Sequence, residues 1–247
     1  MFSRAWMLRL TPRGCDMTTL LNNLGIVKRN IVRADNSAVA RLSKLGVATI
    51  HEAMGRVGLM KPYMRPVYKG ANMCGTAVTI LLQPGDNWMM HVAAEQLQPG
   101  DVAVAACTTD NTDGFFGDLL ATSFKARGAV GLIIDGGVRD VTELEKMGFP
   151  VVSKAIHAKG CIKATLGSVN VPIVCAGAQV FPGDVVIADI DGVVVVPAAM
   201  AIEVAGAAEK RESFEGEKRA RFAAGELGLD MYNMRGLLEK AGLKYID

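Results

Sequence analysis

The sequence predicts a single α/β domain in which layered sheets are flanked by helices. Short runs rich in valine and isoleucine alternate with helix-forming segments over most of the 247 residues, as is typical of packed sheet and helix layers. Pro-Gly-Asp turns begin at Pro84, Pro99 and Pro182 and adjoin such runs. No linker rich in proline, glycine or serine divides the chain, so we expect one domain.

The composition excludes several classes of function. Half of the residues are hydrophobic and the formal net charge is only +2, which does not favour binding to nucleic acid or to an anionic membrane. No apolar run is long enough to span a membrane. The five cysteines are scattered without a C-x-x-C pair, which predicts reduced thiols and a cytoplasmic protein. The three histidines form no zinc motif.

The first elements are expected to be helices. We interpret residues 1–16 as an extension or an upstream start and residues 17–247 as the domain. A helix is predicted from Asn36 to Leu45, where Gly46 follows. Thr49 and Glu52 fit a capping box that would open a second helix.

Strands and a helix follow in the next segment. The β-branched run Gly75–Leu82 predicts a strand, and Val102–Cys107 predicts a second, buried one. Between them we expect a helix over Trp88–Leu97, which stops before a Pro-Gly-Asp turn. Asn87 stands at the N-cap position of this helix.

A helix and a strand then bring polar residues back to one place. Good helix formers run from Asp118 to Gly128, and Ala129–Ile134 is an apolar run typical of a buried strand. A helix of about ten residues carries the chain roughly 15 Å away, and a strand of about six residues returns it roughly 20 Å. Arg139 and Asp140 should therefore face Asp118 across a small gap. Asp140 would also cap the next helix, with Glu143 as its capping-box partner.

That gap combines groups suited to anions and to cations. Asp118 and Asp140 suit a divalent cation, and Arg139 suits a carboxylate or a developing oxyanion. The N–H groups of Leu119 and Leu120, in the first helical turn, can bind an anion. Two capped helices with a solvated arginine remain the alternative. No lysines cluster here, which favours a metal over a Schiff base if an enolate is to be stabilised.

The remaining segments complete the layers. Asp-Gly between two valine-rich runs predicts a β-hairpin, and turn chemistry explains Asp189 and Asp191 better than a metal site does. The charged segment 198–223 is expected to be helical with a solvated face. Further strands are predicted at Val151–Ser153, Ile162–Leu166 and Val171–Cys175, and a last helix at Met231–Ala241.

These motifs together resemble a known family. The chain is similar, from about Asp16 to Asp247, to the divalent-metal pyruvate aldolases that cleave 4-hydroxy-4-methyl-2-oxoglutarate and 4-carboxy-4-hydroxy-2-oxoadipate, which are relatives of the regulator of ribonuclease E activity A. The resemblance rests on Gly117-Asp118 and, twenty residues later, Arg139-Asp140, and on Gly46–Thr49, Pro84–Trp88, Leu166–Pro172, Pro182–Asp184 and Gly225–Asp230.

The resemblance implies a role for each matching residue. Asp140 would bind Mg²⁺ or Mn²⁺, and Arg139 would stabilise the enolate oxygen. The backbone around Gly117, Leu119 and Leu120 would receive the substrate carboxylate.

Other implied roles involve a second subunit. Asp118, with Glu52 and Glu215 from a neighbour, would hold the water that protonates the enolate. Asn87 would lie near the substrate, instead of serving only as a helix cap. Three acids compete for the tail position: Glu212, Glu215 and Glu217.

The implied fold is a β/β/α-type sandwich in a homotrimer or homohexamer, with active sites between subunits and residues 198–247 packed on a neighbour. The implied activity is release of pyruvate from a 2-oxo acid during breakdown of aromatic compounds, with no nucleic acid or membrane partner. Two alternatives stay open: an oxaloacetate decarboxylase, as a main or side activity, and a non-catalytic regulator that binds ribonuclease E.

Overall fold

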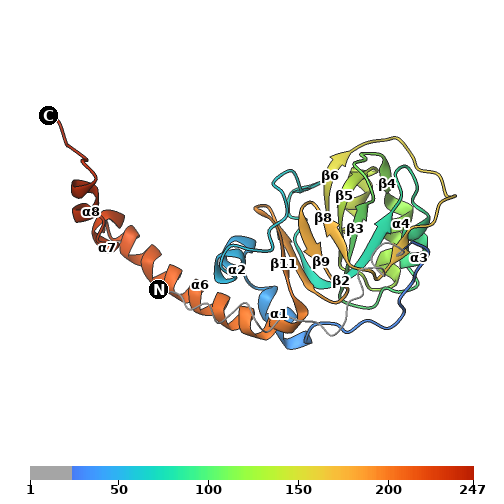
Figure 1. Cartoon of the computed structure of the whole chain (residues 1–247), viewed down its shortest axis with the longest axis horizontal. Helices are drawn as coiled ribbons and strands as arrows, with labels where there is room; N and C mark the ends of the chain where they lie inside the picture. Colours follow the sequence, from blue (N-terminus) through green and yellow to red (C-terminus); the bar gives the residue numbers. More distant parts are fainter. Residues whose placement is uncertain (1–23) are drawn as a thin grey trace.

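A computed structural model describes residues 24–247, so the expectation for residues 1–16 lies outside the described chain. Its centre is a nine-stranded mixed sheet in the order β1-β6-β5-β3-β2-β10-β11, with β4 beside β5 and β7 beside β2 (Figure 1). The strands are β1 (Arg65–Pro66), β2 (Met73–Leu82), β3 (Asp101–Cys107), β4 (Gly114–Phe116), β5 (Gly131–Val138), β6 (Val151–Ile156), β7 (Ser168–Val169), β10 (Val185–Asp189) and β11 (Gly192–Val196).

The middle of the sheet is parallel. Strands β2, β3, β5 and β6 run in the same direction, as does the short β4 beside β5. Their carboxyl ends therefore meet at one edge, where ligands bind in open α/β sheets. The edge strands β10 and β11 form the predicted antiparallel hairpin, with Asp189 opposite Gly192. An isolated antiparallel bridge joins Val194 of β11 to Leu59, which precedes β1 in the chain.

Layers cover both faces of the sheet, which confirms the predicted α/β class. Helices α3 (Trp88–Ala93), α4 (Asp118–Ala126) and α5 (Val141–Lys146) pack on one face around the rings of Phe116 and Phe124. The hairpin of β8 (Ile173–Cys175) and β9 (Ala178–Val180) covers the other face. The order hairpin, sheet, helices is the β/β/α arrangement that the family resemblance implies.

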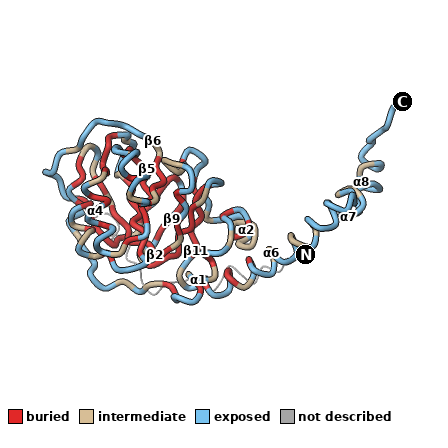
Figure 2. The backbone as a smooth tube through the Cα atoms, turned by 180° about the vertical axis from the view of Figure 1, so that it is seen from behind, coloured by how far each residue is buried: buried red, intermediate tan, exposed pale blue. Residues whose placement is uncertain are grey.

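The remaining helices gather at the β10–β11 side. Helices α1 (Asn36–Leu42), α2 (Val47–Ala53) and the start of α6 (Ala201–Ala223) share one core cluster. After a short 3-10 turn (Ala198–Met200), α6 runs away from this cluster and leads into α7 (Gly228–Met231) and α8 (Arg235–Lys240), which are exposed (Figures 1 and 2). Packing of this arm on a neighbour stays a prediction. No helix between residues 24 and 247 is long and apolar enough to cross a membrane.

One predicted helix start is wrong because a distant side chain sets it, whereas α1 begins at Asn36 as predicted. The capping box of Thr49 does not form, since α2 begins at Val47, whose N–H donates to the Asp189 carboxylate at 2.8 Å. Asp189 also accepts from Asp191 N at 2.8 Å, so its carboxylate serves both the β10–β11 turn and the start of α2. Helix α1 is capped by Asp35 and ends at Leu42.

Four other elements also differ from their predicted form. Segment 162–166 is a loop and not a strand, while β5 continues to Val138 beyond its predicted end. Helix α3 ends at Ala93. The predicted last helix is two short ones, because the chain turns at Asn233, which has a positive φ of 52°.

Candidate active site

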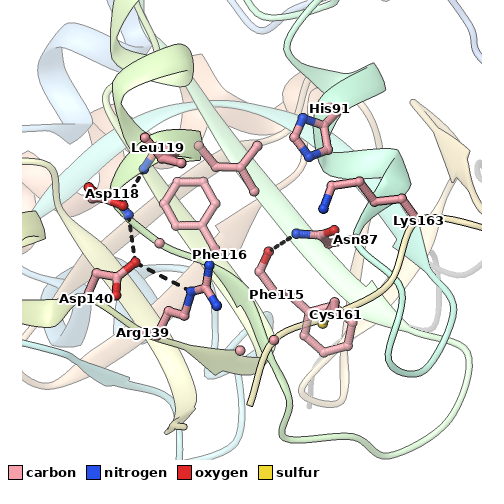
Figure 3. Close-up of a pocket in the computed structure, with 14 residues that line it drawn as sticks. Asn87, His91, Phe115, Phe116, Asp118, Leu119, Arg139, Asp140, Cys161 and Lys163 are labelled. Atoms are coloured by element: carbon pink, nitrogen blue, oxygen red, sulfur yellow. Dashed lines mark hydrogen bonds and ion pairs between the residues drawn. The ribbon is translucent and has the colours of Figure 1, made fainter. Parts of the chain in front are cut away.

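The edge where β4 and β5 end carries a cavity of about 130 Å³. Four segments converge on it: the start of α3, the β4–α4 junction, the β5–α5 junction and the loop around residues 160–163 (Figure 3). Its lining includes Asn87, His91, Phe116, Gly117, Asp118, Leu119, Leu120, Arg139, Asp140, Cys161 and Lys163. The predicted meeting of the Gly117-Asp118 and Arg139-Asp140 motifs is therefore confirmed.

Asp140 is fixed in an uncommon conformation. Its backbone is left-handed, with φ 57°, and its side chain does not cap α5 as predicted. Instead its Oδ2 accepts from Asp118 N at 3.3 Å and lies 3.5 Å from Arg139 Nε. A Cβ on Gly117 would come 2.2 Å from the same oxygen, so only glycine fits there. A strained non-glycine residue at a cavity is typical of functional sites.

The first turn of α4 supplies donors, one of which is already used. Asp118 turns its carboxylate onto Leu119 N at 2.8 Å, so the free N–H expected at Leu119 is occupied. Within residues 24–247 nothing accepts from Leu120 N. The anion nest predicted here therefore holds one free donor and one covered by a movable side chain.

Arg139 projects into the cavity from the end of β5. Its backbone N–H donates to Phe116 O at 2.9 Å, which joins the ends of β4 and β5. The guanidinium is about half exposed, and a Cβ on Gly160 would lie 3.1 Å from its Nη1. The glycine leaves room for this planar group, so the arginine can donate to a ligand in the cavity.

Asn87 carries an unsatisfied acceptor. Its side chain is buried and donates from Nδ2 to Phe115 O at 2.9 Å. The other end, Oδ1, is buried without a hydrogen-bond partner in the described chain, and such an acceptor normally finds one. The alternative that Asn87 is only a cap is wrong, since Asp86 takes the Trp88 N–H instead.

Three residues of the lining had no signal in the sequence. His91, Cys161 and Lys163 reach the cavity from α3 and from the loop that was predicted as a strand. Burial and then nearby acids raise the pKa of Cys161 to about 11, so its thiol stays neutral. Partial burial, and then the charge of Lys163, lower the pKa of His91.

The acids of the cavity fit a divalent cation that also keeps water and substrate ligands. In the described chain no three His, Cys, Asp or Glu side chains form a complete metal cage. Asp118 and Asp140 each use one carboxylate oxygen in hydrogen bonds and leave the other free. One or two carboxylates completed by water and substrate oxygens are the coordination that Mg²⁺ prefers.

Glu52 and Glu215 are not part of this cavity within one chain. They lie together on α2 and α6, bridged by Arg211, which is 3.5 Å from Glu52 and 2.8 Å from Glu215. These helices stand at the far end of the sheet from α4 (Figure 1). Glu212 instead pairs with Arg219. Any role of these acids at the cavity requires a second copy of the chain.

Comparisons with known proteins agree with this architecture. A family model described as RraA-like, Aldolase/RraA, matches residues 47–195. A protein of Halalkalibacterium halodurans named "Putative 4-hydroxy-4-methyl-2-oxoglutarate aldolase" is 28% identical over 189 residues, which cover 76% of this chain and 90% of that protein.

Two solved structures show the same fold. RraAS2 of Streptomyces coelicolor, described as an unusual member of the RNase ES inhibitor RraA family, is 28% identical, with a TM-score of 0.69 over 77% of this chain and 99% of its own. A protein of Pseudomonas syringae is 25% identical, with a TM-score of 0.71 over 80% and 97% of the two chains.

Proposed function

This chain belongs to the RraA-like family of aldolases and RraA proteins, and from that premise we propose that it is a divalent-metal-dependent pyruvate aldolase. Its substrates are 4-carboxy-4-hydroxy-2-oxoadipate and 4-hydroxy-4-methyl-2-oxoglutarate, which arise in the cytoplasmic breakdown of aromatic compounds. The observation that carries the proposal is the polar set around Arg139. Within residues 24–247 it comprises two acids with free oxygens, a free helix N–H and an acceptor without a donor.

The 2-oxo acid end of the substrate binds at the start of α4. Leu120 N–H and the positive end of the helix receive its carboxylate. Leu119 N–H joins them when the Asp118 carboxylate turns away from it, and Gly117 lets the substrate approach the backbone closely. These contacts are the same for the aldol substrate and for the product pyruvate. They therefore orient either molecule without favouring one over the other.

Arg139 acts on the charge that develops during cleavage. The bond between C3 and C4 breaks, and its electron pair forms an enolate across C2 and C3. The C4 hydroxyl passes its proton to the water held by Asp118 and becomes a carbonyl. The Arg139 guanidinium donates hydrogen bonds to the enolate oxygen at C2. That charge is larger in the transition state than in the bound substrate, so the interaction accelerates the reaction.

A cation held by Asp140, with Asp118 beside it, completes the site. Mg²⁺ or Mn²⁺, if bound there, would supply a Lewis acid for the 2-oxo group. Asp118 also orients the water that delivers a proton to C3 of the enolate. Glu52 and Glu215 of a neighbouring copy hold this water from the other side, in a trimer or a hexamer.

A mixing experiment tests the shared site. Asp140→Ala and Glu52→Ala proteins are each expected to be inactive, and mixed oligomers should regain activity because some sites combine an intact Asp140 with an intact Glu52. No recovery, despite demonstrated subunit exchange, would show that the site is built within one chain.

The function itself is tested by pyruvate release. Both aldol substrates and oxaloacetate are assayed with and without a chelator, followed by Mg²⁺ or Mn²⁺. We expect cleavage that the chelator abolishes and the metal restores, and no lysine adduct after borohydride treatment. Full activity in excess chelator, or cleavage of sugar phosphates alone, would contradict the proposal.

Two alternatives are separated by the same measurements. Oxaloacetate decarboxylation needs the same enolate, so faster turnover of oxaloacetate than of either aldol would make it the main activity. The Streptomyces relative is named as a member of a ribonuclease inhibitor family. A chain that released no pyruvate and inhibited a ribonuclease E in vitro would be a regulator of that kind.

A further inference from the structure

Strand β5 contains a β-bulge shortly before Arg139. Two of its residues, Asp135 and Gly136, lie opposite the single residue Lys154 of β6. At the same point β5 changes its other neighbour, from β3 to β4. Bulges beside active sites commonly redirect the side chains that follow them. The contacts that hold this bulge therefore bear on the direction of Arg139.

The Asp135 carboxylate is the centre of these contacts. Its Oδ2 accepts from Ala176 N, in the β8–β9 hairpin, at 2.9 Å. Tyr63 Oη donates to the same carboxylate and lies 3.1 Å from Oδ1 and 3.2 Å from Oδ2. Lys154 Nζ stands 3.8 Å from Oδ1. Three separate segments thus hold the first residue of the bulge from the hairpin side of the sheet.

The hairpin turn that contacts Asp135 is itself fixed. Ala176 and Gly177 form the two-residue turn between β8 and β9, with φ of 46° and 82°. An alanine with positive φ is uncommon and persists only where its surroundings hold it. Ala176 is buried, and its carbonyl accepts from Lys61 N at 2.9 Å. The turn and the segment that carries Tyr63 therefore form one support.

The same network extends to the loop between β3 and β4. Partial burial, and then the charge of Asp135, raise the pKa of Tyr63 to about 12, so its hydroxyl stays protonated and donates at neutral pH. Lys154 pairs with Asp110 of the loop as well as with Asp135. The loop leads to the Gly117-Asp118 motif, and β5 leads to Arg139. The network thus contacts the approaches to both motifs of the cavity.

The chain between the bulge and the cavity is closely packed. A Cβ on Gly137 would come 2.1 Å from Thr112 O, and Gly137 N donates to Asp113 O at 3.1 Å. Two residues later, Arg139 N donates to Phe116 O at 2.9 Å. A shift of the bulge is therefore passed along β5 to Arg139, because tightly packed segments transmit strain.

We propose that Asp135 is a positioning residue for Arg139: by holding the bulge against Tyr63 and Ala176, it aims the guanidinium at the reacting 2-oxo group. Asp135 does not line the cavity, so it acts through the strand and not on the substrate. The inference rests on the proposed function and extends it to the support of the site from the opposite face of the sheet.

The test compares kcat and KM for 4-hydroxy-4-methyl-2-oxoglutarate, with Mg²⁺, in the wild type and in variants. Asp135→Ala should lower kcat about 10- to 100-fold, since a misplacement of about 1 Å costs roughly 100-fold in rate. KM should stay within about threefold, because the contacts at α4 are kept. Asp135→Asn can still accept from Ala176 N and donate to Tyr63, so it should regain most of kcat.

A double-mutant cycle shows whether Asp135 acts through Arg139. In Arg139→Lys the guanidinium is absent, so adding Asp135→Ala should lower kcat by less than about threefold more. Equal effects in the two backgrounds would contradict the proposal. If Asp135→Ala does not fold, Tyr63→Phe carries the same comparison, because it removes one donor only and should give a smaller loss of kcat.

Asp184→Ala is the matched control. The Asp184 carboxylate also accepts from backbone N–H groups, those of Phe181 and Ala198, each at 2.9 Å. It does not line the cavity. This variant should therefore lower the melting temperature and leave kcat per folded enzyme unchanged.

Crystal structures separate this inference from the proposed function, because they do not depend on activity. In Asp135→Ala the Arg139 guanidinium should lie about 1 Å from its wild-type position. If it moves but the wild type cleaves no aldol, the proposed function fails while the positioning of Arg139 by Asp135 stands. If the wild type is active, and Asp135→Ala shows only a lower melting temperature with normal kcat and an unmoved guanidinium, the inference is wrong and the aldolase stands.

Discussion

The charged residues at the two edges of the parallel sheet differ in how completely they are hydrogen-bonded. At the amino edge, where β3 begins, Asp101 is fully buried and accepts four hydrogen bonds. Their donors are Arg33, through Nε at 2.8 Å and Nη2 at 2.7 Å, Thr76 Oγ1 at 2.6 Å and Gln98 N at 2.8 Å. Every oxygen of this carboxylate is occupied.

At the carboxyl edge the polar groups are only partly used. In the described chain Asp118 and Asp140 each keep a free oxygen, Asn87 Oδ1 lacks a donor, and Lys163 and His91 form no side-chain hydrogen bond or ion pair. A saturated network stabilises the fold, whereas an unsaturated one costs stability until a ligand completes it. The contrast separates residues that hold the sheet from residues that act on a substrate.

The largest predicted effect is at Arg139. Arg139→Lys keeps the charge but loses the planar set of donors, so kcat should fall about 100- to 1000-fold with little change in KM. Arg127→Lys, at the exposed end of α4, is the matched control and should be unaffected. A lower melting temperature with normal turnover per folded enzyme would instead make Arg139 a structural residue.

At the amino edge, a substitution should lower stability and leave catalysis unchanged. Asp101→Ala leaves Arg33 and Thr76 without their acceptor, and removing one partner of a buried pair should lower the free energy of unfolding by about 3 kcal/mol. Urea denaturation measures this loss. Activity per folded molecule should stay normal. A loss of kcat without a loss of stability would contradict the proposed difference between the two edges.

The substitution Gly117→Ala has a smaller expected effect and tests the position of the Asp140 carboxylate. The added Cβ would meet the Asp140 carboxylate at 2.2 Å, so the acid must move, and a misplacement of about 1 Å costs roughly 100-fold in rate. Gly236→Ala, in α8 with open space around it, serves as the control. Unchanged kcat and metal dependence in Gly117→Ala would mean that the position of Asp140 is not critical.

Features that depend on residues close together in the chain could be predicted from the sequence. The lengths of helix α4 and strand β5 bring Asp118 and Arg139 together, and Asp-Gly between valine runs gives the β10–β11 hairpin. Both features depend on neighbouring residues in the chain. The central acids and arginine of the site could therefore be named from the sequence.

The rest of the site depends on contacts between distant residues. Asp86 holds Ala164 and Thr165 across 78 and 79 positions, and Asp189 starts α2 across 142. Side-chain hydrogen bonds of this kind leave no periodic pattern, so the loop carrying Lys163 was predicted as a strand. His91, Cys161 and Lys163 were missed for the same reason.

Deuterium exchange of the pyruvate methyl protons is the most direct test of the central claim, that the carboxyl edge generates a pyruvate enolate. Proton NMR in deuterium oxide with Mg²⁺ follows it without any aldol substrate. We expect exchange in the wild type, and none with excess chelator or in Arg139→Lys. Exchange that continued undiminished in Arg139→Lys, or in the presence of chelator, would contradict the claim.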